Sequence, residues 1–187
     1  MKAIETEYKG YRFRSRLEAR WAVFFDACGV KWEYEPEGFD LGDGLYYLPD
    51  FLLHDVWIRN SIKHDLWVEV KGVMNEVDKF KIFKFACANG CDGYIHVNSI
   101  IVLANIPEGD NVFDFFDYII SNYDSGDGFM PTPFHFGEID CDNYHALPCI
   151  SPEGHFAIVG GDYTEDIDNE ATEKAYRLAR QARFEHR

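Results

Sequence analysis

Two short stretches of this 187-residue sequence place acidic and basic side chains where they could bind a metal ion and a phosphate. In a strand over Leu66–Lys71 the side chains alternate between faces, so Glu69 and Lys71 share one face. Asp50 belongs to the preceding expected strand and lies within reach of them if the two strands pair. Mg²⁺ is usually held by one or two carboxylates together with phosphate and water. The set therefore predicts a metal-assisted phosphoryl site, in which Lys71 orients the water or neutralises the phosphate.

Glu18 is a further candidate, at the margin of the apolar stripe of a helix expected over Ser15–Cys28. From that position its carboxylate could lean over the end of a sheet on which the helix packs. Ser15-x-x-Glu18 also matches a capping box, in which the glutamate bonds the N-terminus of its own helix. Taken alone, the spacing favours the cap, and both roles stay open.

The elements around these residues alternate in a way that is typical of an α/β fold with a mixed sheet. The second helix, expected over Asn75–Asn89, turns Val77, Phe80, Phe83 and Ala86 or Cys87 inward. Through residue 103 the order is helix, strand, strand, strand, helix, strand. The expected strands are Lys31–Glu35, Leu45–Leu53, Leu66–Lys71, Tyr94–Val97 and Ile100–Leu103.

Three motifs in this order, RSRLEARW at 14–21, LPDF at 48–51 and WVEVKG at 67–72, resemble the PD-(D/E)XK nuclease superfamily. They look like the small nucleases of that type in phage and bacterial genomes. The resemblance implies a restriction-endonuclease-like αβββαβ core. It also implies that Asp50 and Glu69 bind the metal, that Lys71 is the catalytic lysine, and that Glu18 is a helix carboxylate assisting metal or water.

The resemblance covers one part of the chain and leaves the remainder without a counterpart. We expect a nuclease-like core over 1–105, an acidic extension of unknown role over 106–167, and a C-terminal helix within 168–187 packed on the core. The extension is expected to contain a short helix over Asn111–Ile120 and a strand over His155–Val159. The final helix, over Asp168–Glu185, begins with acids and ends with arginines, which suits its macrodipole.

The formal net charge of −15 is distributed unevenly along the chain. Residues 86–173 contain 17 Asp and Glu and no Lys or Arg, whereas the basic residues lie towards the two ends. Candidate DNA phosphate contacts are Arg12, Arg14, Arg16 and Arg20, with Lys79, Lys81 and Lys84 either contacting phosphate or lying on an ordinary solvated face. The acidic segment favours an alternative function, in which the chain mimics the DNA phosphate array and binds a DNA-binding partner.

Five cysteines, an odd number, predict free thiols in a reducing compartment. We therefore expect a cytoplasmic protein, in the host cytoplasm if a phage encodes it, with no membrane partner. A structural Zn²⁺ site is the less favoured interpretation, because the usual short Cys-x2-Cys knuckle is absent. Its candidate ligands are Cys87, Cys91, Cys141, His145 and Cys149.

The leading functional expectation is a DNA nuclease that depends on Mg²⁺ or Mn²⁺ and hydrolyses a phosphodiester bond, most plausibly as an endonuclease. Its partners would be DNA and, through the acidic region 86–173, a protein. A homodimer is also expected, since many double-strand cutters of this fold pair two subunits. The alternative is the acidic DNA mimic or adaptor on a nuclease-fold scaffold.

Overall fold

The structure, a computed structural model, describes residues 4–58, 62–88, 100–108, 119–120, 146–160 and 166–184. Within these residues the helices are α1 (Arg16–Ala27), α2 (Glu76–Ala88) and α3 (Asn169–Gln181). The strands are β1 (Thr6–Tyr8), β2 (Tyr11–Phe13), β3 (Lys31–Tyr34), β4 (Phe39–Asp40), β5 (Tyr46–Tyr47), β6 (Phe51–Ile58), β7 (Ile62–Val70), β8 (Ile100–Leu103), β9 (Ile119–Ile120), β10 (Ala146–Ile150) and β11 (Phe156–Gly160).

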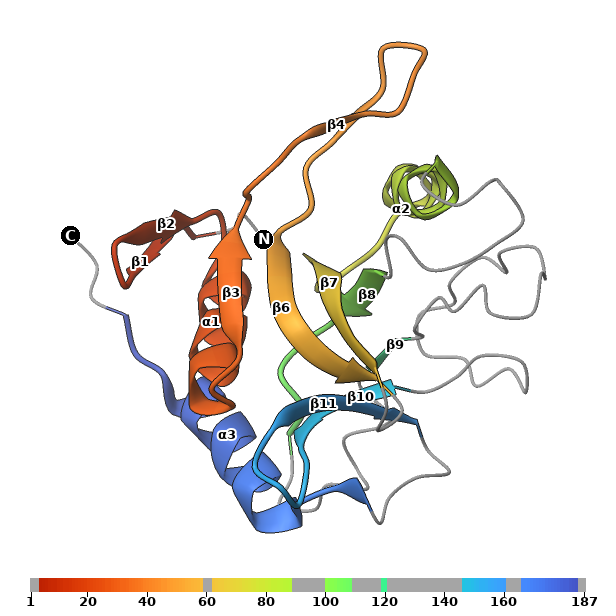
Figure 1. Ribbon diagram of the computed structural model, residues 1–187. Helices are drawn as coiled ribbons and strands as arrows, with labels where there is room; N and C mark the ends of the chain where they lie inside the picture. The colour runs from red at the N-terminus through yellow and green to blue at the C-terminus, as the bar shows by residue number, and fades with distance from the viewer. Residues whose placement is uncertain are drawn as a thin grey trace.

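A mixed sheet forms the centre of the fold, with strand order β10-β11-β6-β7-β8-β9 and with β3 paired to β6 (Figure 1). β6 runs antiparallel to β3 and to β7, whereas β8 is parallel to β7 and β11 is parallel to β6. The main elements follow the chain as α1, β3, β6, β7, α2 and β8, with the β4–β5 hairpin between β3 and β6. The predicted combination of helices with a mixed sheet is confirmed.

One edge of β6 is shared by two strands from distant parts of the sequence. β3 pairs with the first half of β6, as far as His54, and β11 pairs with its end at Trp57. β10 and β11 belong to the segment 106–167. At least this part of the expected acidic extension is therefore built into the main sheet.

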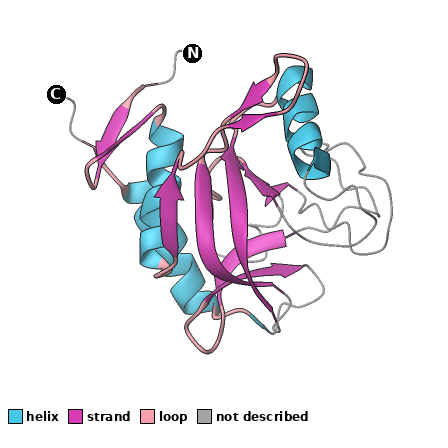
Figure 2. Cartoon of the chain, turned by 45° about the horizontal axis from the view of Figure 1, so that its top comes forward, coloured by secondary structure: helices cyan, strands magenta, loops and turns pink. Residues whose placement is uncertain are grey.

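α1 and α3 cover one face of the sheet, as Figures 1 and 2 show from two directions. The rings of Phe24 in α1 and Tyr176 in α3 stack with their centroids 4.2 Å apart. The Tyr176 hydroxyl donates a hydrogen bond to the Pro148 carbonyl at 2.7 Å, and the Trp21 indole N–H donates to the Ala104 carbonyl at 2.9 Å. The first of these buried bonds ties α3 to β10, and the second ties α1 to the residue that follows β8, so both helices are fixed on this face of the sheet.

α2 and the β4–β5 hairpin pack on the opposite face of the sheet, and the predicted inward face of α2 is wrong. Val77 is 61% exposed and Phe80 52% exposed, whereas Ile82 and Phe85 are fully buried. Phe85 contacts the aromatic rings of Phe39, Tyr47 and Trp67. Because α2 has apolar residues on more than one side, contact with these rings determines which side of the helix is buried. The side chains of Phe83, Ala86 and Cys87 lie outside the described part of the chain.

Two of the predicted strands have different limits in the structure. The strand expected over Leu45–Leu53 is divided into β5 and β6 by residues 48–50. Pro49 has no N–H to donate to a strand ladder, which favours a break at this point. The strand expected over Leu66–Lys71 begins earlier, at Ile62, so β6 and β7 form a longer hairpin than the sequence indicated.

Of the remaining helix and strand predictions, most are confirmed, one is wrong in part, and others concern residues that the structure does not describe. α1, with Ser15 as N-cap, and α3, with Asp168 as N-cap, lie where the sequence predicted them, although α3 ends at Gln181. β3, β8 and β11 also match predicted strands. The end of the helix expected over Asn111–Ile120 is wrong, since Ile119–Ile120 pairs with β8 as a strand. Residues 94–97 and 111–118 lie outside the described residues.

The described cysteines are free, as predicted. Cys28 and Cys149 are buried, and burial raises the pKa of the Cys149 thiol to about 12. Among the described residues, no group of three or more His, Cys, Asp or Glu side chains is arranged to hold a metal ion. The other candidate zinc ligands, Cys91, Cys141, His145 and the Cys87 side chain, lie outside the described part.

Within the described residues, no helix combines the length and the apolar character that crossing a bilayer would require.

Candidate active site

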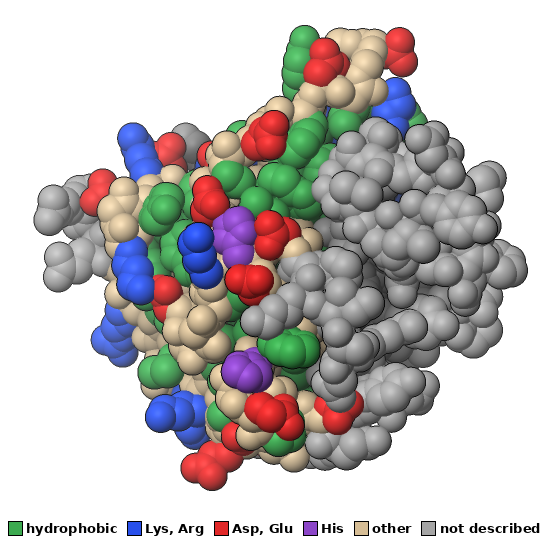
Figure 3. All heavy atoms as spheres, in the orientation of Figure 1, with side chains coloured by type: hydrophobic (Ala, Val, Ile, Leu, Met, Phe, Trp, Pro, Cys, Tyr) green, Lys and Arg blue, Asp and Glu red, His purple; other side chains and the backbone are tan. Residues whose placement is uncertain are grey.

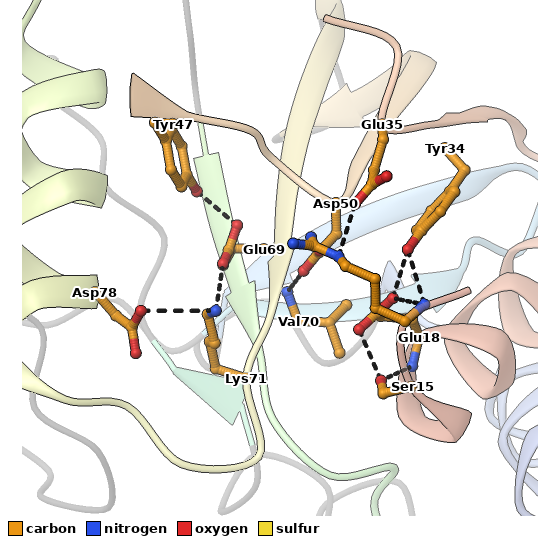
Figure 4. A network of polar contacts seen from close by, with 11 residues as sticks. Ser15, Glu18, Tyr34, Glu35, Tyr47, Asp50, Glu69, Val70, Lys71 and Asp78 are labelled. Atoms are coloured by element: carbon orange, nitrogen blue, oxygen red, sulfur yellow. Dashed lines mark hydrogen bonds and ion pairs between the residues drawn. The ribbon is translucent and has the colours of Figure 1, made fainter. Parts of the chain in front are cut away.

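The candidate carboxylates come together where β6 begins and β7 ends. The antiparallel register sets Phe51 opposite Val68, which brings Asp50 beside Glu69. Asp50 is 2% exposed and Glu69 3% exposed. Figure 4 shows both carboxylates and Lys71 between α2 and the first turn of α1. The strand pairing that would bring these three residues together is therefore present.

Both carboxylate oxygens of Asp50 already have partners in the protein. Oδ2 accepts a hydrogen bond from the Val70 backbone N–H at 2.7 Å. Oδ1 lies 2.5 Å from Nη2 of Arg14, and the Nε of the same guanidinium lies 2.7 Å from Oε1 of Glu35. Arg14 therefore bridges a buried carboxylate and a more exposed one.

The negative charges at this site are crowded. Burial, reinforced by the charges of Glu69 and Glu18, raises the pKa of Asp50 to about 8, against the opposing effects of the Val70 N–H and Arg14. Burial also raises the pKa of Glu69, although Lys71 and the Tyr47 hydroxyl act in the opposite direction. The cations present thus do not fully offset the cost of burying these carboxylates, and a further positive charge would stabilise their ionised forms.

Glu69 is held between a lysine and a tyrosine. Lys71 Nζ lies 3.0 Å from Glu69 Oε1 and 3.7 Å from Asp78 Oδ1 of α2. The Tyr47 hydroxyl donates to Glu69 Oε2 at 2.7 Å. Burial lowers the pKa of Lys71, but the carboxylates of Glu69, Asp78 and Asp50 together outweigh it, so the net pKa is raised. Lys71 is therefore an ammonium ion at neutral pH, suited to neutralising a phosphate and not to removing a proton.

Glu18 is buried and fully hydrogen-bonded. Its Oε1 accepts from the Ser15 hydroxyl at 2.7 Å, and its Oε2 accepts from the Tyr34 hydroxyl at 2.7 Å and from the Arg14 N–H at 3.0 Å. The Glu18 N–H in turn donates to Ser15 Oγ at 3.2 Å, as in a cap. The capping geometry is therefore real, while the charge of Glu18 still reaches Asp50 and raises its pKa.

We expect Glu18→Gln to melt within about 2 °C of wild type, because a glutamine can keep every contact of Glu18. Its amide oxygen can accept from Tyr34 and Arg14, and its NH2 group can donate to Ser15 Oγ. If the charge of Glu18 serves catalysis, metal-dependent cleavage of DNA falls by roughly 10²-fold.

The comparison variant for Glu18→Gln is Asp168→Asn, which removes a carboxylate from the N-cap of α3 and keeps its capping ability. Melting curves and cleavage rates are measured for both proteins. Wild-type cleavage by Glu18→Gln would leave Glu18 with a capping role alone.

The four predicted phosphate-binding arginines have different surroundings. Arg14 contacts the site itself, whereas Arg12 is exposed and paired with Glu5 on the β1–β2 hairpin. Arg16 is also exposed, and Arg20 is partly buried in α1. Figure 3 shows that most Lys and Arg side chains on this face lie on its left side, over the β1–β2 hairpin, α1 and α3.

Four residues of the site were not predicted from the sequence. Tyr47 donates to Glu69, and Asp78 lies beside Lys71. Tyr34 donates to Glu18, and Glu35 pairs with Arg14. Tyr47 stands three positions before Asp50, and that proximity was an available signal. The partnership of Asp78 depends on how α2 packs, which no local pattern indicates.

Replacing Tyr47 with phenylalanine is expected to weaken cation binding wherever protons compete with the cation for Glu69. The hydroxyl lowers the pKa of Glu69 by hydrogen bonding to its ionised form, so its loss raises that pKa. A Ca²⁺ titration by calorimetry at several pH values should show the pH midpoint of binding moving upward. Tyr46→Phe, at a 65% exposed neighbour, is the control. An unchanged midpoint in Tyr47→Phe would contradict this role.

The donor set fits a hard divalent cation that keeps several non-protein ligands. Asp50 and Glu69 provide two neighbouring buried carboxylates, and Mg²⁺ commonly takes only one or two from the protein. The oxygens of Glu18 are engaged by three donors, so Glu18 fits better as a nearby charge than as a direct ligand.

No protein-family model, curated protein or solved structure matches this chain.

Proposed function

We propose that this protein is a Mg²⁺- or Mn²⁺-dependent DNA nuclease, an endonuclease with a restriction-endonuclease-like αβββαβ core. The observation that carries the proposal is the pair of neighbouring buried carboxylates Asp50 and Glu69, with the Lys71 ammonium ion 3.0 Å from Glu69. The element order α1, β3, β6, β7, α2, β8 supports the same interpretation. The proposal also draws on the motif resemblance over residues 10–105.

In this proposal the acidic residues bind the cation and the lysine neutralises the phosphate. Asp50 and Glu69 would hold the cation, which would polarise a phosphate oxygen and lower the pKa of the attacking water. Lys71, held by Glu69 and Asp78, would neutralise the charge that develops on the phosphate. Glu18 and Tyr34 hold the backbone N–H of Arg14, which keeps α1 in place beside the carboxylates.

The proposal is tested by incubating plasmid and short labelled duplex or single-stranded DNA with the protein, with Mg²⁺, with Mn²⁺ or with EDTA. Cleavage that requires the cation and is lost in Asp50→Ala supports it. Glu76→Ala is the matched control, because its side chain is 87% exposed at the start of α2. No cleavage by the folded wild-type protein under any of these conditions would overturn it and favour the acidic mimic or adaptor.

A further inference from the structure

The guanidinium of Arg14 occupies the side of Asp50 on which a cation would bind. Oδ2 of Asp50 accepts from the Val70 N–H inside the β-ladder, which leaves Oδ1 as the oxygen that faces outward. Arg14 Nη2 lies 2.5 Å from that Oδ1. A divalent ion that binds Oδ1 would therefore lie in contact with the guanidinium. The two positive charges at one oxygen would repel each other.

The guanidinium is better placed to move than the carboxylate it contacts. The Arg14 side chain is 54% exposed, whereas that of Asp50 is 2% exposed. The Arg14 backbone is held separately, since its N–H donates to Glu18 Oε2 and to the Tyr34 hydroxyl. A swing of the side chain would thus leave the first turn of α1 in place.

Glu35 provides a second anchor for the same guanidinium. Its Oε1 lies 2.7 Å from Arg14 Nε, and its backbone N–H donates to the Asp50 carbonyl at 2.9 Å. Glu35 therefore stays beside Asp50 whatever Arg14 does. An arginine released from Asp50 can remain on Glu35 with its Nη groups free to bind an anion near the site, and a phosphate matches its planar fork.

We propose that Arg14 exchanges partners when the cation binds: its guanidinium holds the carboxyl group of Asp50 in the cation-free protein and turns to a substrate phosphate once a divalent cation binds Asp50. This inference rests on the proposed nuclease function and assigns Arg14 a positioning role that links cation loading to phosphate capture. Lys71 does not share this role, because it is held between Glu69 and Asp78 and faces the other carboxylate.

The first test measures Ca²⁺ binding by calorimetry in wild type, Arg14→Gln and Arg12→Gln. The titrations are run at pH 9, where protons compete least with the cation for Asp50. Loss of a competing cation should tighten Ca²⁺ binding in Arg14→Gln by about 5–10-fold. Arg12→Gln removes the same charge from an exposed residue two positions away and should bind like wild type. Equal or weaker binding by folded Arg14→Gln would overturn the exchange.

The second test is a crystal structure of the wild-type protein soaked with Ca²⁺, which does not depend on the folding of any variant. The expected result is a bound ion on Asp50 with Arg14 Nη2 no longer within hydrogen-bonding distance of Oδ1. An ion on Asp50 with Arg14 still in place would overturn the exchange and leave the nuclease proposal standing. Absence of any ion at Asp50 and Glu69, together with no Ca²⁺ binding in solution, would overturn both.

Discussion

Lys71→Ala is expected to lower metal-dependent DNA cleavage by ~10²–10³-fold and to leave the protein folded. The Lys71 ammonium ion lies 3.0 Å from Glu69 at the end of β7, where a phosphate held by the cation would come within its reach. Its side chain is 30% exposed and is no part of either apolar cluster. Cleavage rates at saturating Mg²⁺, with circular dichroism as the measure of folding, test the expectation.

Lys9→Ala is the control for this variant, because Lys9 lies in the turn of the β1–β2 hairpin and pairs with Asp26 at 2.8 Å, away from Asp50 and Glu69. Loss of Lys71 also removes a charge that lowers the pKa of Glu69, so Ca²⁺ affinity is measured in parallel. If Lys71→Ala cleaves like wild type at saturating metal, its assignment as the phosphate-neutralising group is wrong.

Asp50→Asn is expected to abolish cleavage and, in EDTA, to change how stability depends on pH. The folded-state pKa of Asp50 is raised from 3.8 to about 8, so between these values the folded protein holds a proton that the unfolded chain has released. Stability in the metal-free protein therefore falls as the pH rises from about 4 to about 8. Asparagine has no such proton to lose, so the variant should not show the part of the fall in stability that Asp50 causes between about pH 4 and about pH 8.

Thermal melts of wild type and Asp50→Asn from pH 4 to pH 9, with EDTA and with Mg²⁺, measure this effect. Mg²⁺ should restore the stability of the wild type at high pH, because it favours the ionised carboxylates, and should do little for the variant. Asp43→Asn, at a 93% exposed carboxylate, is the control. Parallel pH profiles for wild type and Asp50→Asn would contradict the raised pKa.

The parts of this site that the sequence predicted depend on local signals. Ser15 and Gly29 mark the two ends of α1, and period-2 alternation places Glu69 and Lys71 on the face opposite to Val68 and Val70. Such signals act over a few residues and do not depend on the rest of the fold. They were sufficient to bring Asp50 next to Glu69, since the two strands follow each other and pair antiparallel.

The wrong predictions for the inward face of α2 and for the start of β7 arise because both features depend on tertiary contacts. α2 carries apolar residues on several sides, so periodicity could not distinguish Val77 and Phe80 from Ile82 and Phe85, and the aromatic rings beneath the helix decide the matter. Polar residues such as His54 in the β6–β7 hairpin resemble a connection in the sequence, yet strand pairing continues past them.

The partners of the charged residues also could not be predicted from the local sequence. Arg14 belongs to a run of arginines that resembles a DNA-binding surface in the sequence. The fold directs its guanidinium to Asp50, 36 positions away. Glu18 likewise acquires the Tyr34 hydroxyl from a strand that only the packing of α1 brings near. Charge patterns identify such groups, and tertiary structure decides what each of them neutralises.

The shared edge of β6 has a consequence for the order of folding. Every described residue of the candidate site lies within the stretch from Arg14 to Asp78, and β6 and β7 pair residues at most 17 positions apart. In contrast, β11 reaches β6 by pairing Ala157 with Trp57, 100 positions earlier in the chain. Closing a loop about six times longer costs about 1.6 kcal/mol more in chain entropy. We therefore expect β10 and β11 to dock last, with their amides becoming protected after those of the β6–β7 hairpin in pulse-labelling hydrogen exchange.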